Sequence, residues 1–184
     1  MNVEKLTELP DEIQNRSSLK ISGSLAASGL LLFLYPAASI AFLMISVTLA
    51  TAVITKRYGL NRFGIETATF TVVVNGAVFG PQIGALLALV TIVLQVMTGS
   101  GGAYILWVVP GYVAAGLVSG FLGTVSLASD GVLITVALQV FFGGTTAVLY
   151  PSYVGKFIPR ALAAIVFNIV LFRAAAEPVA SAMM

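Results

Sequence analysis

Long uncharged, apolar runs alternate with short polar segments along the chain. No Asp, Glu, Lys or Arg occurs in residues 21–55, 67–129, 131–155 or 161–172. A helix needs roughly 20 residues to cross the hydrocarbon core of a bilayer, so the first two runs are long enough for more than one crossing. The pattern predicts an all-α protein, a polytopic bundle of transmembrane helices.

Glycine and proline residues divide the longer runs into helix-sized pieces. Pro36 lies near the middle of the first run, and Gly80-Pro81 and the segment 99–102 (Gly-Ser-Gly-Gly) interrupt the second. The divided runs predict helices over residues 67–79, 82–97, 104–123, 131–150 and 160–176. Two further helices in residues 21–55 give seven spans, and one long tilted or kinked helix there gives six.

Composition places the chain among membrane proteins. Apolar residues make up 59 % and charged residues 9 %, against about 45–50 % and about 25 % in soluble domains. Residues 1–20 carry seven of the 16 charged residues, and we expect them to form a polar cytoplasmic tail that is retained. Residues 21–184 are predicted to form a single transmembrane domain. The formal net charge of +2 is too small to indicate binding to nucleic acid.

The basic residues predict an orientation in the membrane. With seven spans, eight of the nine Lys and Arg residues fall on one face and only Arg173 falls on the other. The positive-inside rule makes that face cytoplasmic, with the N-terminus inside, whereas six spans divide the basic residues between the faces. The charges therefore favour seven spans, and the tail, which is not built like a cleavable signal, suits a prokaryotic inner membrane.

The residue types needed for enzyme chemistry are scarce. The chain has no His and no Cys, which removes the usual ligands of zinc, haem and iron–sulfur centres. Beyond the tail the carboxylates are Glu66, Asp130 and Glu177, too far apart in sequence to indicate an acid–base pair. The glycine segment 99–102 lacks the Lys-Ser/Thr of a P-loop. We expect no enzyme activity, no metal and no cofactor.

Small residues at a spacing of four indicate close helix packing, because they let two helix backbones approach. One set is expected to serve packing inside the bundle: Gly76, Gly80, Gly84, Gly116 and Gly120. A second set on the first apolar run has two interpretations, internal packing or a docking stripe for a partner subunit: Gly23, Ser24, Ala27 and Ser28.

A few polar and aromatic residues inside the spans are candidates for binding a solute. Polar side chains in hydrocarbon either pair between helices or line a site, and the candidates of this kind are Asn75, Gln82, Gln139 and Asn168. Tyr104 and Trp107 are either interfacial anchors or stacking walls for a planar ligand. Arg173 either pairs locally with Glu177 or binds an anionic group of the solute.

Residues 75–123 carry a resemblance to a known family. Their order of motifs is Gly80-Pro81, then the glycine segment 99–102, then Pro110-Gly111-Tyr112. This order resembles the substrate-binding S components of energy-coupling-factor transporters, with the biotin-type members nearest. The resemblance implies an integral subunit of about six helices that captures a vitamin, has no ATPase of its own and docks through its first helix on a coupling subunit that carries two ATPases.

Three functional hypotheses follow. The first is capture of a vitamin-like solute for a multi-subunit importer, which predicts a cavity lined by aromatic residues and amides. The second is a non-catalytic structural or assembly subunit of a larger membrane complex, which predicts no cavity. The third is a small stand-alone permease, which predicts a continuous hydrated path.

Overall fold

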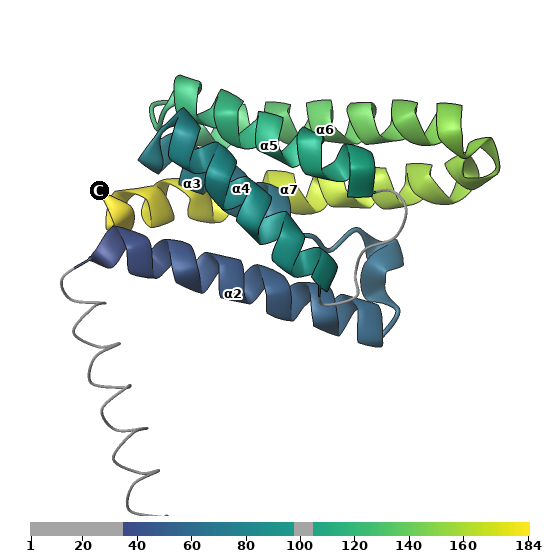
Figure 1. The fold of residues 1–184 in the computed structure, drawn as a ribbon, viewed down its shortest axis with the longest axis horizontal. Coiled ribbons are helices and arrows are strands. Elements are labelled where there is room, and N and C mark those ends of the chain that lie inside the picture. Colours follow the sequence, from purple (N-terminus) through teal and green to yellow (C-terminus); the bar gives the residue numbers. More distant parts are fainter. Residues whose placement is uncertain (1–34, 98–104) are drawn as a thin grey trace, which may run out of the picture. The chain divides into compact units, whose positions relative to one another are not determined.

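The structure is a computed structural model that describes residues 35–97 and 105–184. The chain divides between Ser39 and Ile40 into two units, and all contacts discussed below lie within residues 40–184. The fold is all-α, and the described residues form six α-helices (Figure 1). These are α2 (Pro36–Arg57), α3 (Ala68–Phe79), α4 (Pro81–Gln95), α5 (Ile105–Leu122), α6 (Leu127–Leu149) and α7 (Val154–Met183), with 3₁₀ turns η2 (Leu60–Phe63) and η4 (Pro151–Tyr153).

Three of these helices are long and apolar enough to cross a membrane, which indicates a multi-pass membrane protein. They are α2, α6 and the continuous helical stretch Pro151–Met183 that contains α7. The other three are apolar but shorter. The 12 residues of α3 rise about 18 Å, less than the roughly 30 Å thickness of the hydrocarbon core.

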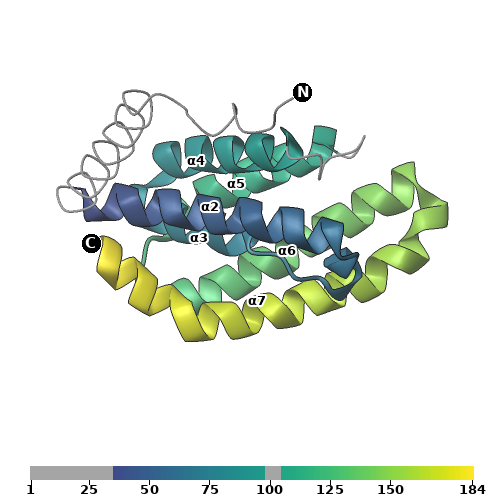
Figure 2. The same ribbon diagram turned by 90° about the horizontal axis from the view of Figure 1, so that it is seen from below.

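Helix α3 forms the core of the described unit. Every residue from 68 to 77 is buried, as expected for a helix that is apolar all round. Figures 1 and 2 show α3 in the middle of the unit, between α2 and the helices α4 to α7. Because α3 lies among the other helices, the residues at its two ends help to position the helices that meet at each end of the bundle.

Glycine residues join α3, α4 and α5 at one end of the bundle. Gly80 has a φ of 84°, a conformation that glycine adopts without strain, and the chain reverses there into Pro81 of α4. A Cβ on Gly84 would lie 2.5 Å from the Gly76 Cα and 2.7 Å from the Gly116 carbonyl oxygen. The three backbones are therefore in direct contact, and Gly120 of α5 packs in the same way against Pro81.

Helices α6 and α7 run side by side as an antiparallel pair (Figures 1 and 2). Gly131 of α6 lies against the ring of Phe172 in α7, and that ring packs on Phe70 of α3 with 5.1 Å between centroids. Helix α6 starts at Leu127, four residues before the predicted start, because Asp130 is tolerated in a first turn, where a carboxylate favours the helix dipole. Helix α7 also continues past the predicted end at residue 176.

Threonine hydroxyls connect α2 to α3. The buried residues of α2 recur every three or four positions, namely Ala41, Ile45, Thr48, Ala52 and Thr55. The Thr48 and Thr71 hydroxyl oxygens are 2.8 Å apart, and Thr67 donates to Thr48 Oγ1 over 3.3 Å. Interhelical hydrogen bonds of this kind stabilise helix pairs in lipid.

Candidate solute-binding cavity

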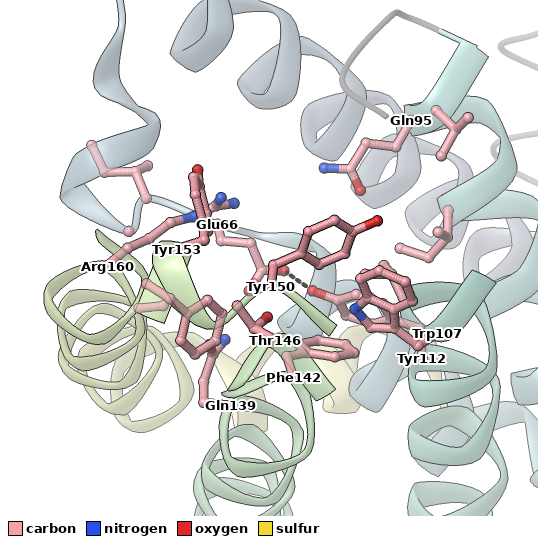
Figure 3. Close-up of a pocket in the computed structure, with 17 residues that line it drawn as sticks. Glu66, Gln95, Trp107, Tyr112, Gln139, Phe142, Thr146, Tyr150, Tyr153 and Arg160 are labelled. Carbon is pink, nitrogen blue, oxygen red and sulfur yellow. Dashed lines mark hydrogen bonds between the residues drawn. The ribbon is translucent and has the colours of Figure 1, made fainter. Parts of the chain in front are cut away.

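A cavity of about 450 Å³ lies at the end of the bundle opposite the glycine contacts. It is framed by the start of α3, the end of α4, the start of α5, the end of α6 and the start of α7 (Figure 3). Its lining consists of Gly64, Ile65, Glu66, Ile92, Gln95, Val96, Trp107, Val108, Tyr112, Gln139, Phe142, Thr146, Tyr150, Tyr153, Phe157, Arg160 and Ala164. The volume lies within the range of small-molecule sites, about 300–1,000 Å³.

Glu66 places a carboxylate in the cavity wall. Its Oε1 accepts hydrogen bonds from the Thr69 backbone N–H (2.7 Å) and from the Tyr112 hydroxyl (2.9 Å), and its Oε2 accepts from the Thr69 hydroxyl (2.9 Å). The carboxylate thus caps the N-terminus of α3, where the helix dipole favours negative charge. Among the side chains that the structure describes, no Lys or Arg nitrogen lies within 4.0 Å of it.

Aromatic rings form two walls of the cavity. Trp107 of α5 packs on Tyr150 with 5.8 Å between ring centroids, and Tyr112 packs on Phe142 with 5.6 Å. Tilted aromatic pairs at these distances are favourable beyond their buried area. The two pairs join α5 to the end of α6, so the walls belong to the framework of the bundle.

Arg160 reaches the cavity from the first turns of α7. Gly64, with a φ of 65°, lies directly on the α7 backbone, and a Cβ at that position would be 2.7 Å from the Arg160 carbonyl oxygen and would overlap the Ala164 nitrogen. This contact places Glu66, two residues later, beside the same part of α7. Figure 3 shows Arg160 on the Glu66 side of the cavity, across from Trp107.

The structure brings some of the predicted solute-binding residues to the cavity. Trp107 and Gln139 line it. Asn168 is fully buried directly behind it, and its amide nitrogen donates to the backbone carbonyls of Ala164 (3.0 Å) and Glu66 (3.5 Å). These three residues come from α5, α6 and α7.

Other predicted residues lie elsewhere. Asn75 is fully buried within α3, and neither polar atom of its amide has a hydrogen-bond partner among the residues that the structure describes. Gln82 is exposed beside the Gly80 turn, and Arg173 is exposed on α7, beyond the cavity lining. Tyr104 and the docking candidates Gly23, Ser24, Ala27 and Ser28 lie outside the described residues.

Of the packing candidates, Gly76, Gly84 and Gly116 meet at one crossing, and Gly80 and Gly120 flank Pro81.

Several lining residues were not among the predicted site residues, notably Glu66, Arg160, Tyr150 and Phe142. Glu66 had a signal that points to it: it is the only acidic residue between residue 20 and Asp130, and it immediately precedes an apolar helix. Arg160 had none, because a basic residue at the predicted start of a span is typical of an ordinary membrane-flanking charge.

Comparison of the chain with models of protein families, with curated proteins and with solved structures gives no match. Function must therefore be inferred from the cavity and its side chains. In the described residues no group of three or more Asp or Glu is placed to hold a metal ion. What the lining offers is aromatic surface, amides and two opposite charges, which is chemistry suited to binding a small organic molecule.

Proposed function

We propose that this chain is a membrane-embedded capture subunit that binds a vitamin-like small solute for a multi-subunit importer of the energy-coupling-factor type. The observation that carries the proposal is the cavity of about 450 Å³, lined by paired aromatic rings, Gln139 and the Glu66 carboxylate. A purely structural subunit has no need of such a cavity. The resemblance of residues 75–123 to S components of these importers points in the same direction.

The glycine contacts favour capture over free conduction. At the end opposite the cavity, the backbones of α3, α4 and α5 touch at Gly76, Gly84 and Gly116, and backbones in contact leave no room for a hydrated path between these three helices. A site open at one end needs a partner to release its solute across the membrane. We therefore expect a transmembrane coupling subunit with ATPases, and a home in a prokaryotic inner membrane.

Native mass spectrometry of the gently extracted protein tests this proposal, because it reports small ligands and protein partners together. We expect a bound solute and an ATPase-bearing partner. Trp107→Ala should abolish solute retention while leaving the helical circular dichroism unchanged. Phe121→Ala is the matched control, because Phe121 lies on the same helix and is 78 % exposed. Absence of both solute and partner from the spectra would refute the proposal.

One observation favours a second candidate, a small stand-alone permease. Five basic residues, Lys56, Arg57, Arg62, Lys156 and Arg160, lie in the segments at the cavity end of the bundle. The positive-inside rule places that end in the cytoplasm, where the cavity would be the inward-open site of a permease. With the N-terminus in the cytoplasm, seven spans place the cavity on the cytoplasmic side. Six spans with the same N-terminus place the cavity on the side of the external medium, as an importer requires.

Cysteine labelling separates the two orientations, because the native chain has no Cys. Ser152→Cys marks the cavity end, in η4, and Val125→Cys marks the opposite end, where Val125 is 95 % exposed. A membrane-impermeant maleimide added to intact cells should label Ser152→Cys if the protein captures solute from the medium. Labelling of Val125→Cys alone would favour the permease.

A further inference from the structure

The cavity is lined by two opposite charges that form no direct ion pair with each other. The Glu66 carboxylate and the Arg160 guanidinium both line it, yet no nitrogen of Arg160 lies within 4.0 Å of a Glu66 oxygen. In the part of the chain that the structure describes, Arg160 also has no hydrogen bond or ion pair with any other side chain. Glu66 is half-buried and Arg160 is exposed, so a ligand can reach both charges.

The hydrogen bonds around Glu66 leave its charge available to a ligand. The four hydrogen bonds that its oxygens accept within the described residues come from Thr69 and Tyr112, which are neutral donors. They fix the position of the carboxylate without cancelling its negative charge. Oε1 takes two short bonds and Oε2 takes one, so Oε2 retains the capacity to accept another donor, since each carboxylate oxygen can accept about two.

Aromatic faces next to a carboxylate favour a cationic group. Tyr112 donates to Glu66 and packs at a tilt on Phe142, and Trp107 packs at a tilt on Tyr150. A ligand cation near these rings is attracted by their π faces as well as by the carboxylate. Arg160, on the Glu66 side of the cavity, offers a planar fork of donors that matches a carboxylate.

We propose that the cavity selects a small aromatic zwitterion, with its cationic nitrogen on Glu66 among the rings of Tyr112 and Trp107 and its anionic group on Arg160. This inference rests on the proposed function, since it assigns a substrate class to the same site. It disfavours two simpler classes, because a plain anion would engage only Arg160 and a plain cation would engage only Glu66.

Three probes of one shape test the proposal by isothermal titration of the full-length protein in lipid nanodiscs. They are L-phenylalanine (zwitterion), 2-phenylethylamine (cation) and 3-phenylpropanoate (anion), which share a ring and a chain and differ only in charged groups. We expect the zwitterion to bind at least about tenfold more tightly than either of the others, since each lost charge-assisted bond removes roughly that factor.

Two variants assign the charged groups. Glu66→Gln keeps an acceptor for the Thr69 backbone N–H and removes the charge, so it should weaken the zwitterion and the cation about tenfold and leave the anion unchanged. Arg160→Gln should weaken the zwitterion and the anion and leave the cation unchanged. Glu177→Gln and Arg173→Gln, exposed on the same helix α7 outside the cavity, serve as controls and should change none of the three.

The outcomes separate this inference from the proposed function. If the anion or the cation binds as tightly as the zwitterion, if no probe binds, or if Glu66→Gln leaves the order of affinities intact, the zwitterion proposal is wrong. Solute capture nevertheless stands if native mass spectrometry finds a bound solute of another charge class. Both fall together if the probes fail and the extracted protein carries no solute and no partner.

Discussion

The glycine contact between α3, α4 and α5 predicts a large penalty for a single methyl group. Gly84→Ala would place a Cβ 2.5 Å from the Gly76 Cα and 2.7 Å from the Gly116 carbonyl oxygen. Non-bonded carbon atoms prefer separations of about 3.5–4.0 Å, so the helices must move apart by about 1 Å. The backbone atoms on both sides cannot rotate away as a side chain would.

The magnitude follows from two opposing terms. Overpacking of this kind costs about 1–3 kcal/mol of the free energy of unfolding, whereas replacing glycine by alanine inside a helix gains about 1 kcal/mol. The exposed Gly144 of α6 has nothing within 4 Å of the position that its Cβ would take, so Gly144→Ala shows the gain alone. Relative to the wild type, we therefore expect Gly84→Ala to be between equally stable and about 2 kcal/mol less stable. Relative to Gly144→Ala, it should be about 1–3 kcal/mol less stable.

The assay is reversible unfolding in mixed detergent micelles, followed by far-ultraviolet circular dichroism and by the fluorescence of Trp107, the single tryptophan. Both variants carry the same substitution in an apolar helix, so effects of side-chain entropy and of detergent binding largely cancel between them. If Gly84→Ala is as stable as Gly144→Ala, the three backbones are not in contact in the membrane protein.

Three further predictions concern polar groups and use the same unfolding assay. Thr48→Val removes the hydrogen bond to Thr71 and should cost about 0.6 kcal/mol. The cost should be smaller when Thr71 is already valine, although Thr67 still donates to Thr48; an unchanged cost would show that the Thr48 and Thr71 hydroxyls do not interact. Asn75→Leu should leave stability unchanged or raise it, because the buried amide has no partner to lose within the described part of the chain, and a clear loss would reveal one. Tyr112→Phe breaks the bond to Glu66 and should cost about 0.5–1.5 kcal/mol, whereas Tyr150→Phe, whose hydroxyl has no hydrogen bond within the described residues, should cost nothing.

The helices could be predicted where glycine and proline mark their ends. The prediction for residues 67–79 agrees with α3 to within one residue, because Gly80-Pro81 ends one helix and starts the next. Prediction was poorer for α7, which runs without interruption through Pro159 and Pro178 to Met183. Both prolines lie inside the helix, so neither of these local breakers marks an end of α7.

The cavity was predicted only in part, for a reason that lies in the segment between α2 and α3. Trp107 and Gln139 were identified because polar and large aromatic residues stand out in apolar helices. Glu66 was interpreted as a charge in the loop between two spans, and Arg160 as a flanking charge at the start of a span. They meet at the cavity because Gly64, in a conformation with positive φ, lets the segment lie directly on the α7 backbone. Nothing in the hydrophobic pattern indicates that long-range contact.

The cavity is partly open to its surroundings. The aromatic pairs and the glycine contacts keep the surrounding helices from collapsing into the space. Water or solute must therefore occupy it, and the lining, with aromatic faces between a carboxylate and a guanidinium, favours an aromatic solute over water alone.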